Sequence, residues 1–267
     1  MTRRIALVIE YDGTGYAGFQ RQADAPSIQE ELENAIQSLT AVRATIRGAG
    51  RTDAGVHALG QVAAFDTQSI LPVERIAAGL NHYLGEQIAV RAAYDVAPSF
   101  DPRRHAKSRV YRYRLLEGRA PFPLRRNVTY RVTRRLDADL MRLAAMDLVG
   151  QHDFRAFSGP QPQGRSFTRR MIRADVVRND DELAVELEAN AFLPQQVRRT
   201  AGALVDVGLG RMTVSAFRQM MESGAQGAAE TVLPARGLTL QEVRYAGFPP
   251  ESHATTTHDE TYEPGSP

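Results

Sequence analysis

Cysteine is absent from the 267 residues, which excludes disulfide bonds, thiolate nucleophiles and thiolate metal ligands. The sequence contains no run of about 18 apolar residues, so it offers no transmembrane helix. The apolar run near the N-terminus is followed directly by Glu10 and Asp12 and is too short for the core of a signal peptide. We therefore expect a cytoplasmic protein that uses carboxylate, histidine, tyrosine, serine or arginine chemistry.

Lysine is almost absent as well, since Lys107 is the only lysine among 33 basic residues. Arginine binds phosphate through planar, bidentate contacts and stacks on bases, but a bias in genomic base composition explains the excess equally well. Within residues 103–114, arginines are interleaved with Tyr111 and Tyr113. This pattern is typical of a nucleic-acid surface, although a run of charge is more often a solvated face.

Motifs for cofactors and metals are missing. Asp12, Gly13 and Gly15 follow a predicted strand but have neither the Walker nor the dinucleotide-binding spacing. No paired carboxylates suggest a hydrolytic dyad, and His253 and His258 are more consistent with solvated side chains than with metal ligands. We expect no metal and no cofactor.

The alternation of apolar and polar residues predicts the order βαββαβ in each half of the chain. A helix beginning at Ser27 has the capping box formed by Ser27 and Glu30. The other predicted helices are 73–82, 137–149, 195–209 and 214–222. The predicted strands are 5–9, 45–47, 61–65, 88–96, 109–116, 128–132, 169–178, 183–189 and 238–244.

This order predicts an α+β fold of two ferredoxin-like (split βαβ) lobes with antiparallel sheets. The first lobe would span residues 1–105 and the second 106–247. Residues 248–267 are rich in Pro, Thr, Ser and acidic residues, and we expect a disordered tail there because the segment cannot bury enough apolar surface.

Residues 48–58 combine three glycines with Arg51, Asp53 and His57 and show no apolar periodicity. Glycine permits unusual dihedrals and close approach, so this loop could present Asp53 as a nucleophile or general base. Arg51 could hold the carboxylate ionised. His57 could act as an acid or base or contact the substrate, although a histidine in a loop more often serves as a hydrogen-bonding post. A plain surface turn remains the alternative.

Two further candidates lie in the second half of the chain. Tyr111 shares one strand face with Tyr113, where it could stack on a base or pack in the core. Arg198 lies near the start of a predicted helix, where it would favour a phosphate or the Asp53 carboxylate, unless it is simply exposed to solvent.

Together these segments resemble the tRNA pseudouridine synthase A family over nearly the whole chain. The most specific segment is GRTDAGVHA at 50–58, and YDGTGYAGFQ at 11–20 precedes it. Residues 60–63, 99–103, 109–113, 150–154, 190–192, 197–198 and 236–238 also correspond. One departure is Pro194 with two glutamines before Arg198 and Arg199, so the choice of Arg198 depends on alignment to the neighbouring segments.

The resemblance implies two related lobes, a deep basic cleft and a homodimer that grips tRNA. It carries Asp53 over as the catalytic aspartate, Tyr111 as the base-stacking residue and Arg198 as the charge partner of Asp53. Arg51 would help to flip the target or to hold the RNA.

The implied reaction is the isomerisation of uridine to pseudouridine at positions 38, 39 and 40 of the anticodon stem-loop, without a cofactor. The target must leave the base stack to be reached. Which atom Asp53 attacks is left open. A non-catalytic tRNA-binding protein of the same fold is the alternative. A phosphoesterase is weaker, because its clustered metal-binding carboxylates are missing.

Overall fold

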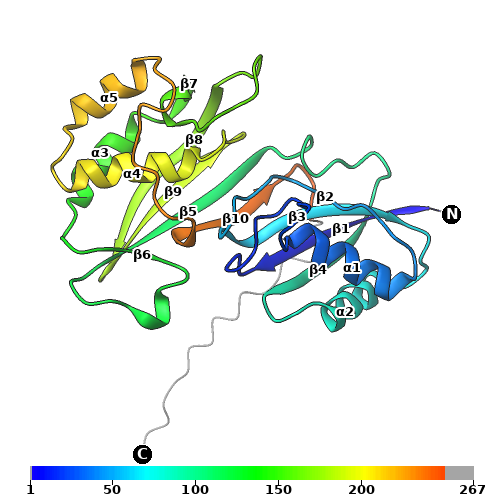
Figure 1. The fold of residues 1–267 in the computed structure, drawn as a ribbon. Coiled ribbons are helices and arrows are strands. Elements are labelled where there is room, and N and C mark those ends of the chain that lie inside the picture. The colour runs from blue at the N-terminus through cyan, green and yellow to red at the C-terminus, as the bar shows by residue number, and fades with distance from the viewer. Residues whose placement is uncertain (1, 250–267) are drawn as a thin grey trace, which may run out of the picture.

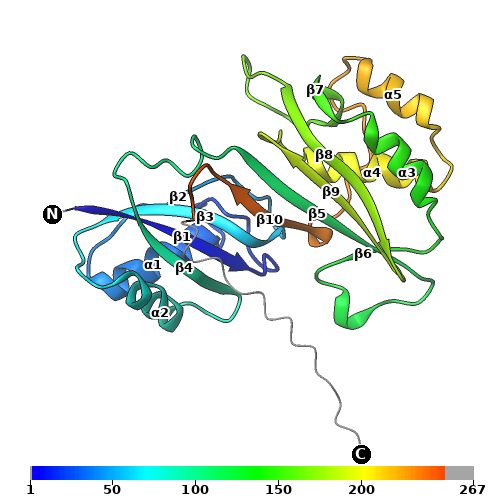
Figure 2. The same cartoon turned by 180° about the vertical axis from the view of Figure 1, so that it is seen from behind.

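The computed structural model describes residues 2–249. Their strands form one sheet in the order β4-β1-β3-β10-β5-β9-β8-β7, with β2 paired to β3 and β6 paired to β5 (Figures 1 and 2). The strands are β1 (Arg3–Tyr11), β2 (Arg47–Gly48), β3 (His57–Thr67), β4 (Ile88–Val96), β5 (Ser108–Glu117), β6 (Tyr130–Val132), β7 (Gly150–Asp153), β8 (Thr168–Asn179), β9 (Glu182–Ala189) and β10 (Leu238–Arg244). The α-helices are α1 (Ile28–Thr40), α2 (Val73–Tyr83), α3 (Ala138–Met146), α4 (Gln196–Gly208) and α5 (Val214–Glu222).

The helices begin where local sequence signals predict. Ser27 caps α1 by accepting a hydrogen bond from the backbone N–H of Glu30 at 3.3 Å. Asp137 caps α3 by accepting from the backbone N–H of Leu140 at 3.0 Å. Such caps satisfy amide groups that have no partner within the helix. The α-helices together with the mostly antiparallel sheet confirm the predicted α+β class. Strand β7 is an addition that the sequence did not indicate.

The sheet is continuous through both halves of the chain, and β10 with β3 and β6 with β5 are parallel pairs within it. Strand β10 pairs antiparallel with β5 and, along its other edge, parallel with β3 through Thr239 opposite His57 and Leu240 opposite Ala58. The last strand of the chain thus joins the two halves into one continuous sheet. Unpaired strand edges expose backbone donors and acceptors, and this pairing removes one such edge from each half. The lobe boundaries at residues 105 and 247 stay predictions.

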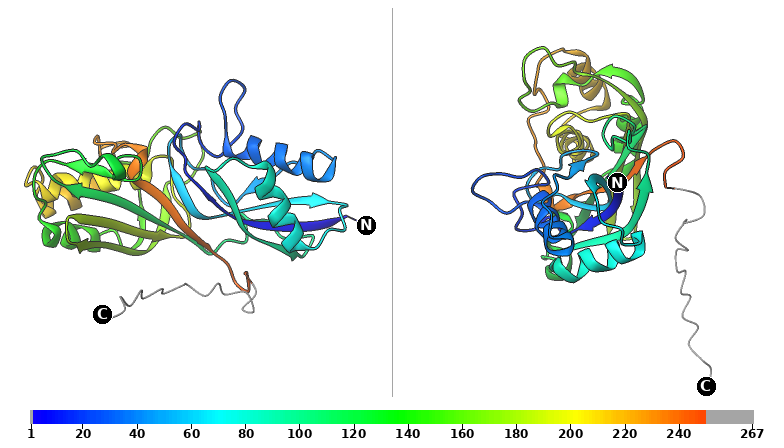
Figure 3. Two further views of the ribbon diagram at one scale, coloured as in Figure 1. Left: turned by 90° about the horizontal axis from the view of Figure 1, so that it is seen from below. Right: turned by 90° about the vertical axis from the view of Figure 1, so that its right-hand side faces the viewer.

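The strand register places a row of side chains across the centre of the sheet. Tyr11 lies opposite Ala58, Ala58 opposite Leu240, and Leu240 opposite Tyr111. All four are at most 8% exposed, and the helices cover one face of the sheet (Figure 3). Two tyrosines that are 100 residues apart in the sequence therefore approach the same region from different strands.

The predicted tail began at Phe248, but this residue is packed. Its ring centroid lies 5.2 Å from that of Phe100 and 5.3 Å from those of Tyr94 and Tyr245. An aromatic ring buries a large apolar area, which fixes the chain at this point. The rest of the predicted tail, with His253 and His258, lies outside the described residues. Within residues 2–249, no helix is long and apolar enough to cross a membrane.

Candidate active site

Residues 49–56 form the loop between β2 and β3 that carries Asp53. The hydroxyl of Tyr11 lies 2.9 Å from Thr52 Oγ1, and the side-chain amide of Gln61 donates to the carbonyl oxygen of Gly50 at 3.0 Å. Burial raises the pKa of Tyr11 to about 12, although hydrogen bonds with Thr52 and Gln61 lower it. Tyr11 therefore stays protonated at neutral pH. The buried side chains of Tyr11 and Gln61 therefore hold the loop at Thr52 and Gly50, the two neighbours of Arg51.

The opposite side of the loop rests against the segment before α1. The backbone N–H of Phe19 donates to the carbonyl oxygen of Thr52 at 3.1 Å. Gly18 has φ +103°, and a Cβ there would lie 2.6 Å from that same oxygen. Only glycine combines this dihedral with so close an approach. The motif at 11–20 thus shapes the support for the Asp53 loop.

Arg109, at the start of β5, ties three segments together beneath this loop. Its guanidinium donates to the carbonyl oxygens of Ala49 at 2.9 Å, Arg103 at 2.7 Å and Asn190 at 2.8 Å. The residue is only 9% exposed, and desolvation by burial lowers its pKa. The guanidinium carries five N–H donors in one rigid plane, so it can donate to three carbonyl oxygens at once. The sequence indicated a basic strand here but not this structural role.

Arg198 reaches Asp53 from helix α4. Its Nη1 lies 3.3 Å from Asp53 Oδ2, and its Nε donates to the carbonyl oxygen of Leu233 at 2.7 Å. Arg199 turns elsewhere and donates to the carbonyl oxygen of Ala229 at 2.7 Å. The structure thus brings Arg198, rather than its neighbour, to the predicted carboxylate. Asp53 remains open to solvent, with 44% of its side chain exposed.

Tyr111 lies on the helix-covered face of β5, as the alternation predicts. Its ring packs edge-on against Phe192, with centroids 5.1 Å apart and planes at 85°. Burial raises the pKa of Tyr111, the charges of Tyr11 and Asp53 add to the rise, and Arg109 opposes it. The phenol is therefore neutral at physiological pH. It lies close enough to Asp53 to feel its charge, and a stacking role stays a prediction.

His57 is 4% exposed, and protein groups engage both of its ring nitrogens. Nδ1 lies 3.1 Å from the backbone N–H of Gly13 and 3.0 Å from Asp12 Oδ1. Nε2 lies 2.8 Å from the carbonyl oxygen of Asn127 and 3.2 Å from that of Arg236. This geometry favours the hydrogen-bonding post over the predicted contact with substrate, because no ring nitrogen is left to reach one.

Arg51 is exposed and lies at the mouth of the pocket that contains Asp53. This pocket has a volume of about 510 Å³, and its wall includes Ala17, Gln20, Arg21 and Thr52. No side chain among residues 2–249 forms an ion pair or hydrogen bond with the Arg51 guanidinium. An unpaired guanidinium therefore stands beside the exposed carboxylate.

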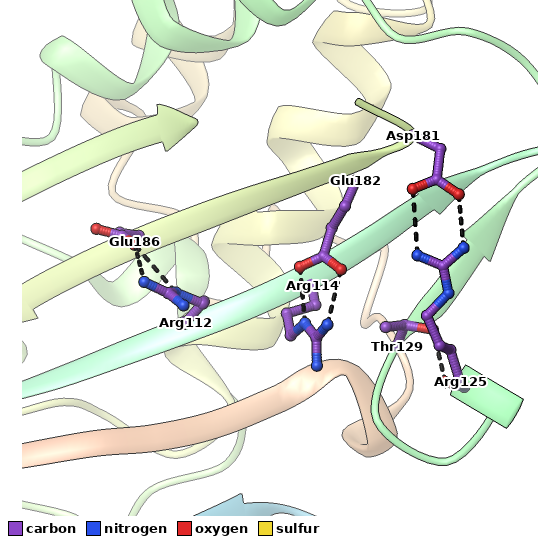
Figure 4. Close-up of polar contacts among 7 residues, drawn as sticks. All are labelled: Arg112, Arg114, Arg125, Thr129, Asp181, Glu182 and Glu186. Carbon is purple, nitrogen blue, oxygen red and sulfur yellow. Dashed lines mark hydrogen bonds and ion pairs between the residues drawn. The ribbon is translucent and has the colours of Figure 1, made fainter. Parts of the chain in front are cut away.

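The other arginines of β5 do not form the cationic surface that the sequence suggested. Arg112 Nη2 lies 2.7 Å from Glu186 Oε1. Arg114 donates from Nε and Nη2 to the two carboxylate oxygens of Glu182, each at 2.7 Å (Figure 4). Alternation places these arginines on the face opposite Tyr111, where β9 supplies carboxylates. Ion pairing neutralises this strand, so its basic residues carry no argument for RNA binding.

Among residues 2–249, no three potential ligand side chains are grouped to hold a metal ion.

The sequence of this chain is similar to those of known proteins over most of its length. The family model for tRNA pseudouridine synthase matches residues 7–103 and 144–246. A tRNA pseudouridine synthase A from Myxococcus xanthus is 41% identical over 264 residues, which cover 98% of this chain and 99% of that protein. The protein of the same name from Maricaulis maris is 40% identical, over 91% of this chain and 98% of its own length. The chain therefore belongs to the tRNA pseudouridine synthase family.

Proposed function

We propose that this protein converts uridine to pseudouridine at positions 38, 39 and 40 of the tRNA anticodon stem-loop, with Asp53 as the catalytic residue. Membership in the family makes the protein an isomerase that acts on uridine in tRNA. The observation that carries the proposal is the exposed Asp53 carboxylate, held by Arg198 3.3 Å away at the wall of a pocket.

The reaction rearranges atoms without redox change. The bond between N1 of uracil and C1′ of ribose breaks, the base turns, and C5 bonds to C1′, while a proton leaves C5 and another is gained at N1. The chemistry needs one carboxylate near the sugar and base, and a site that retains the detached uracil. Asp53 supplies the carboxylate, and Arg198 orients it through the ion pair. Holding a reactive group in place removes part of the entropic barrier.

Arg51 and Tyr111 complete the proposed site. The free guanidinium of Arg51, two residues before Asp53, would contact the RNA or take the place of the extruded nucleotide. The ring of Tyr111 would stack on the uracil, a contact that contributes about 1–3 kcal/mol. We assign His57 to positioning rather than to substrate contact, because its ring joins the Gly13 turn to the carbonyl oxygens of Asn127 and Arg236.

The non-catalytic alternative is less consistent with this site. A protein that only binds RNA gains nothing from an exposed carboxylate in the binding pocket, since Asp53 repels phosphate. We further propose that the protein acts as a homodimer in the cytoplasm, where its substrate is found. The resemblance to the family supports the dimer, and sedimentation velocity of the purified protein tests it.

The decisive experiment incubates the purified protein with unmodified tRNA and maps pseudouridine by position. We expect modification at positions 38–40, none with Asp53→Asn, and a tRNA Kd for that variant within about threefold of the wild-type value. Tyr111→Phe should keep most activity, because the ring remains, whereas Tyr111→Ala should lose it. Wild-type protein that binds tRNA but forms no pseudouridine would establish the non-catalytic alternative. An active Asp53→Asn variant would refute the assigned role of Asp53.

A further inference from the structure

A second pocket adjoins the loop on the other side of Arg51. Its volume is about 330 Å³, and four arginines line it: Arg47, Arg51, Arg103 and Arg104. Its apolar wall includes Phe19, which is 3% exposed. Arg51 thus lines both this pocket and the one that contains Asp53.

Within residues 2–249, the positive charge of this second pocket is only partly compensated. Among residues 2–249, no side chain forms an ion pair or hydrogen bond with the guanidiniums of Arg47, Arg103 or Arg104. The one carboxylate that lines the pocket, Asp101, accepts the backbone N–H groups of Arg103 and Arg104, each at 2.9 Å. The hydrogen bond from the Arg104 backbone and the charges of Arg104 and Arg47 lower the pKa of Asp101. Four arginines thus line the pocket with a single carboxylate, whereas Arg112 and Arg114 of β5 each have a carboxylate partner of their own.

Gly50 leaves open space at the wall of this pocket. Its φ is not in the left-handed region, and a Cβ built on it would meet no atom within 4 Å. By contrast, a Cβ on nearby Gly48 would lie 2.5 Å from the ring of Phe19. Glycine costs conformational entropy, and neither its φ nor the packing among residues 2–249 requires glycine at position 50. Gly50 lines the pocket, so its missing side chain leaves room for a ligand.

We propose that this pocket binds one phosphate and sugar unit of the RNA, next to the nucleotide that Asp53 acts on. Guanidinium groups match phosphate geometry, and the volume lies within the range of small-ligand sites. The inference rests on the proposed function for the identity of the ligand as RNA. Arg51, shared by both pockets, would separate the bound phosphate from the reacting uridine. The pocket would thereby fix the position of the RNA strand relative to Asp53.

Binding of unmodified tRNA, measured across a salt series, tests the pocket directly. We expect Arg104→Gln and Arg47→Gln each to weaken binding about tenfold and to reduce the slope of log K against log salt by roughly 0.7–0.9, the value for one phosphate contact. Arg75→Gln is the matched control, since Arg75 is an exposed arginine on α2 outside both pockets. This variant removes the same charge and should leave the slope unchanged.

Gly50→Leu tests the pocket by filling it, with no change in charge. We expect the same loss of affinity and of salt slope, with a Tm close to the wild-type value because a Cβ at this position meets no atom within 4 Å and Gly50 lines the pocket. Wild-type affinity and slope in Gly50→Leu and Arg104→Gln would overturn the proposal. The binding assay requires no turnover. A protein that forms no pseudouridine would therefore refute the proposed function, and the binding results would still show whether the pocket binds RNA.

Discussion

Arg198 Nη1 lies 3.3 Å from Asp53 Oδ2, although the two residues are 145 positions apart in the sequence. The second anchor of Arg198, its bond to the carbonyl oxygen of Leu233, fixes the direction of the guanidinium. An ion pair this exposed contributes at most about 1 kcal/mol to folding. Its contribution is therefore to hold the carboxylate of one half of the chain in an orientation set by the other half.

Replacement of this arginine should affect turnover more than stability. We expect Arg198→Gln to lower kcat about 100-fold, the usual effect of removing one preorganised electrostatic contact, with little change in Tm. Arg199→Gln is the control, since Arg199 donates to Ala229 and does not face Asp53. Single-turnover pseudouridine formation at saturating tRNA measures both variants. Equal rates for the two would contradict an orienting role for Arg198.

Tyr11 should influence catalysis through Thr52, the residue before Asp53. Tyr11→Phe keeps the ring and removes the hydroxyl that lies 2.9 Å from Thr52 Oγ1. We expect a loss of about 1 kcal/mol in the free energy of unfolding and a tenfold lower kcat, because the loop is held less firmly. KM for tRNA should change little, since Tyr11 is 2% exposed.

The hydroxyl of Tyr245, which is partly buried, provides the control for Tyr11. Tyr245 donates to the carbonyl oxygen of Pro102 at 2.6 Å, outside the Asp53 loop. Tyr245→Phe should lose similar stability and keep its kcat at saturating tRNA. If both variants lose kcat equally, the effect of Tyr11 is general destabilisation rather than positioning of the loop.

Much of the fold could be predicted because its signals are local. The caps at Ser27 and Asp137 depend on residues within one helical turn, and the alternation along 109–116 correctly put Tyr111 and Tyr113 on one face. The glycines around Asp53 marked the loop as unusual for the same reason, since they report backbone requirements at their own positions.

The rest depends on contacts between distant segments, which no local pattern encodes. Nothing near Arg112 reveals that Glu186, 74 residues away, will neutralise it. The parallel pairing of β10 with β3 likewise joins opposite ends of the chain. Tyr11 and Gln61 lie within the recognised motifs, but their hold on the loop became visible only once β1 and β3 were placed side by side. For the same reason the sequence did not reveal that His57 is buried with both ring nitrogens engaged by protein groups.

Arg109 should be irreplaceable by lysine. Its guanidinium satisfies three carbonyl oxygens from three segments, whereas an ammonium group is a point donor that cannot span them. We expect Arg109→Lys to lower the free energy of unfolding by about 2–4 kcal/mol. Urea denaturation measures this change. Lys107→Arg, which makes the reverse substitution on the same chain segment, should be neutral. An unchanged midpoint in Arg109→Lys would contradict the structural role.

Glu186 should make folding stability depend on pH in the acid range. Burial opposes ionisation of this side chain, but hydrogen bonds from Arg112 and Arg173 and their charges outweigh it, so the pKa of Glu186 is below its usual value of 4.5. The ion pairs are 2.7 Å long in both cases. A carboxyl whose pKa is lower in the folded state stabilises the fold fully above the unfolded pKa, and this stabilisation is lost as the pH falls through the folded value.

Glu186→Gln should therefore be less stable than wild type at pH 7, by about 1 kcal/mol since both arginines are partly exposed. The difference should begin to shrink below pH 4.5 and should vanish as the pH falls through the lower folded-state pKa, where the native carboxyl is protonated as well. Urea midpoints across this range measure the effect. Glu86→Gln, at an exposed turn before β4, should run parallel to wild type at every pH. Parallel curves for Glu186→Gln as well would mean that the arginines on this sheet face do not depend on Glu186 for charge compensation.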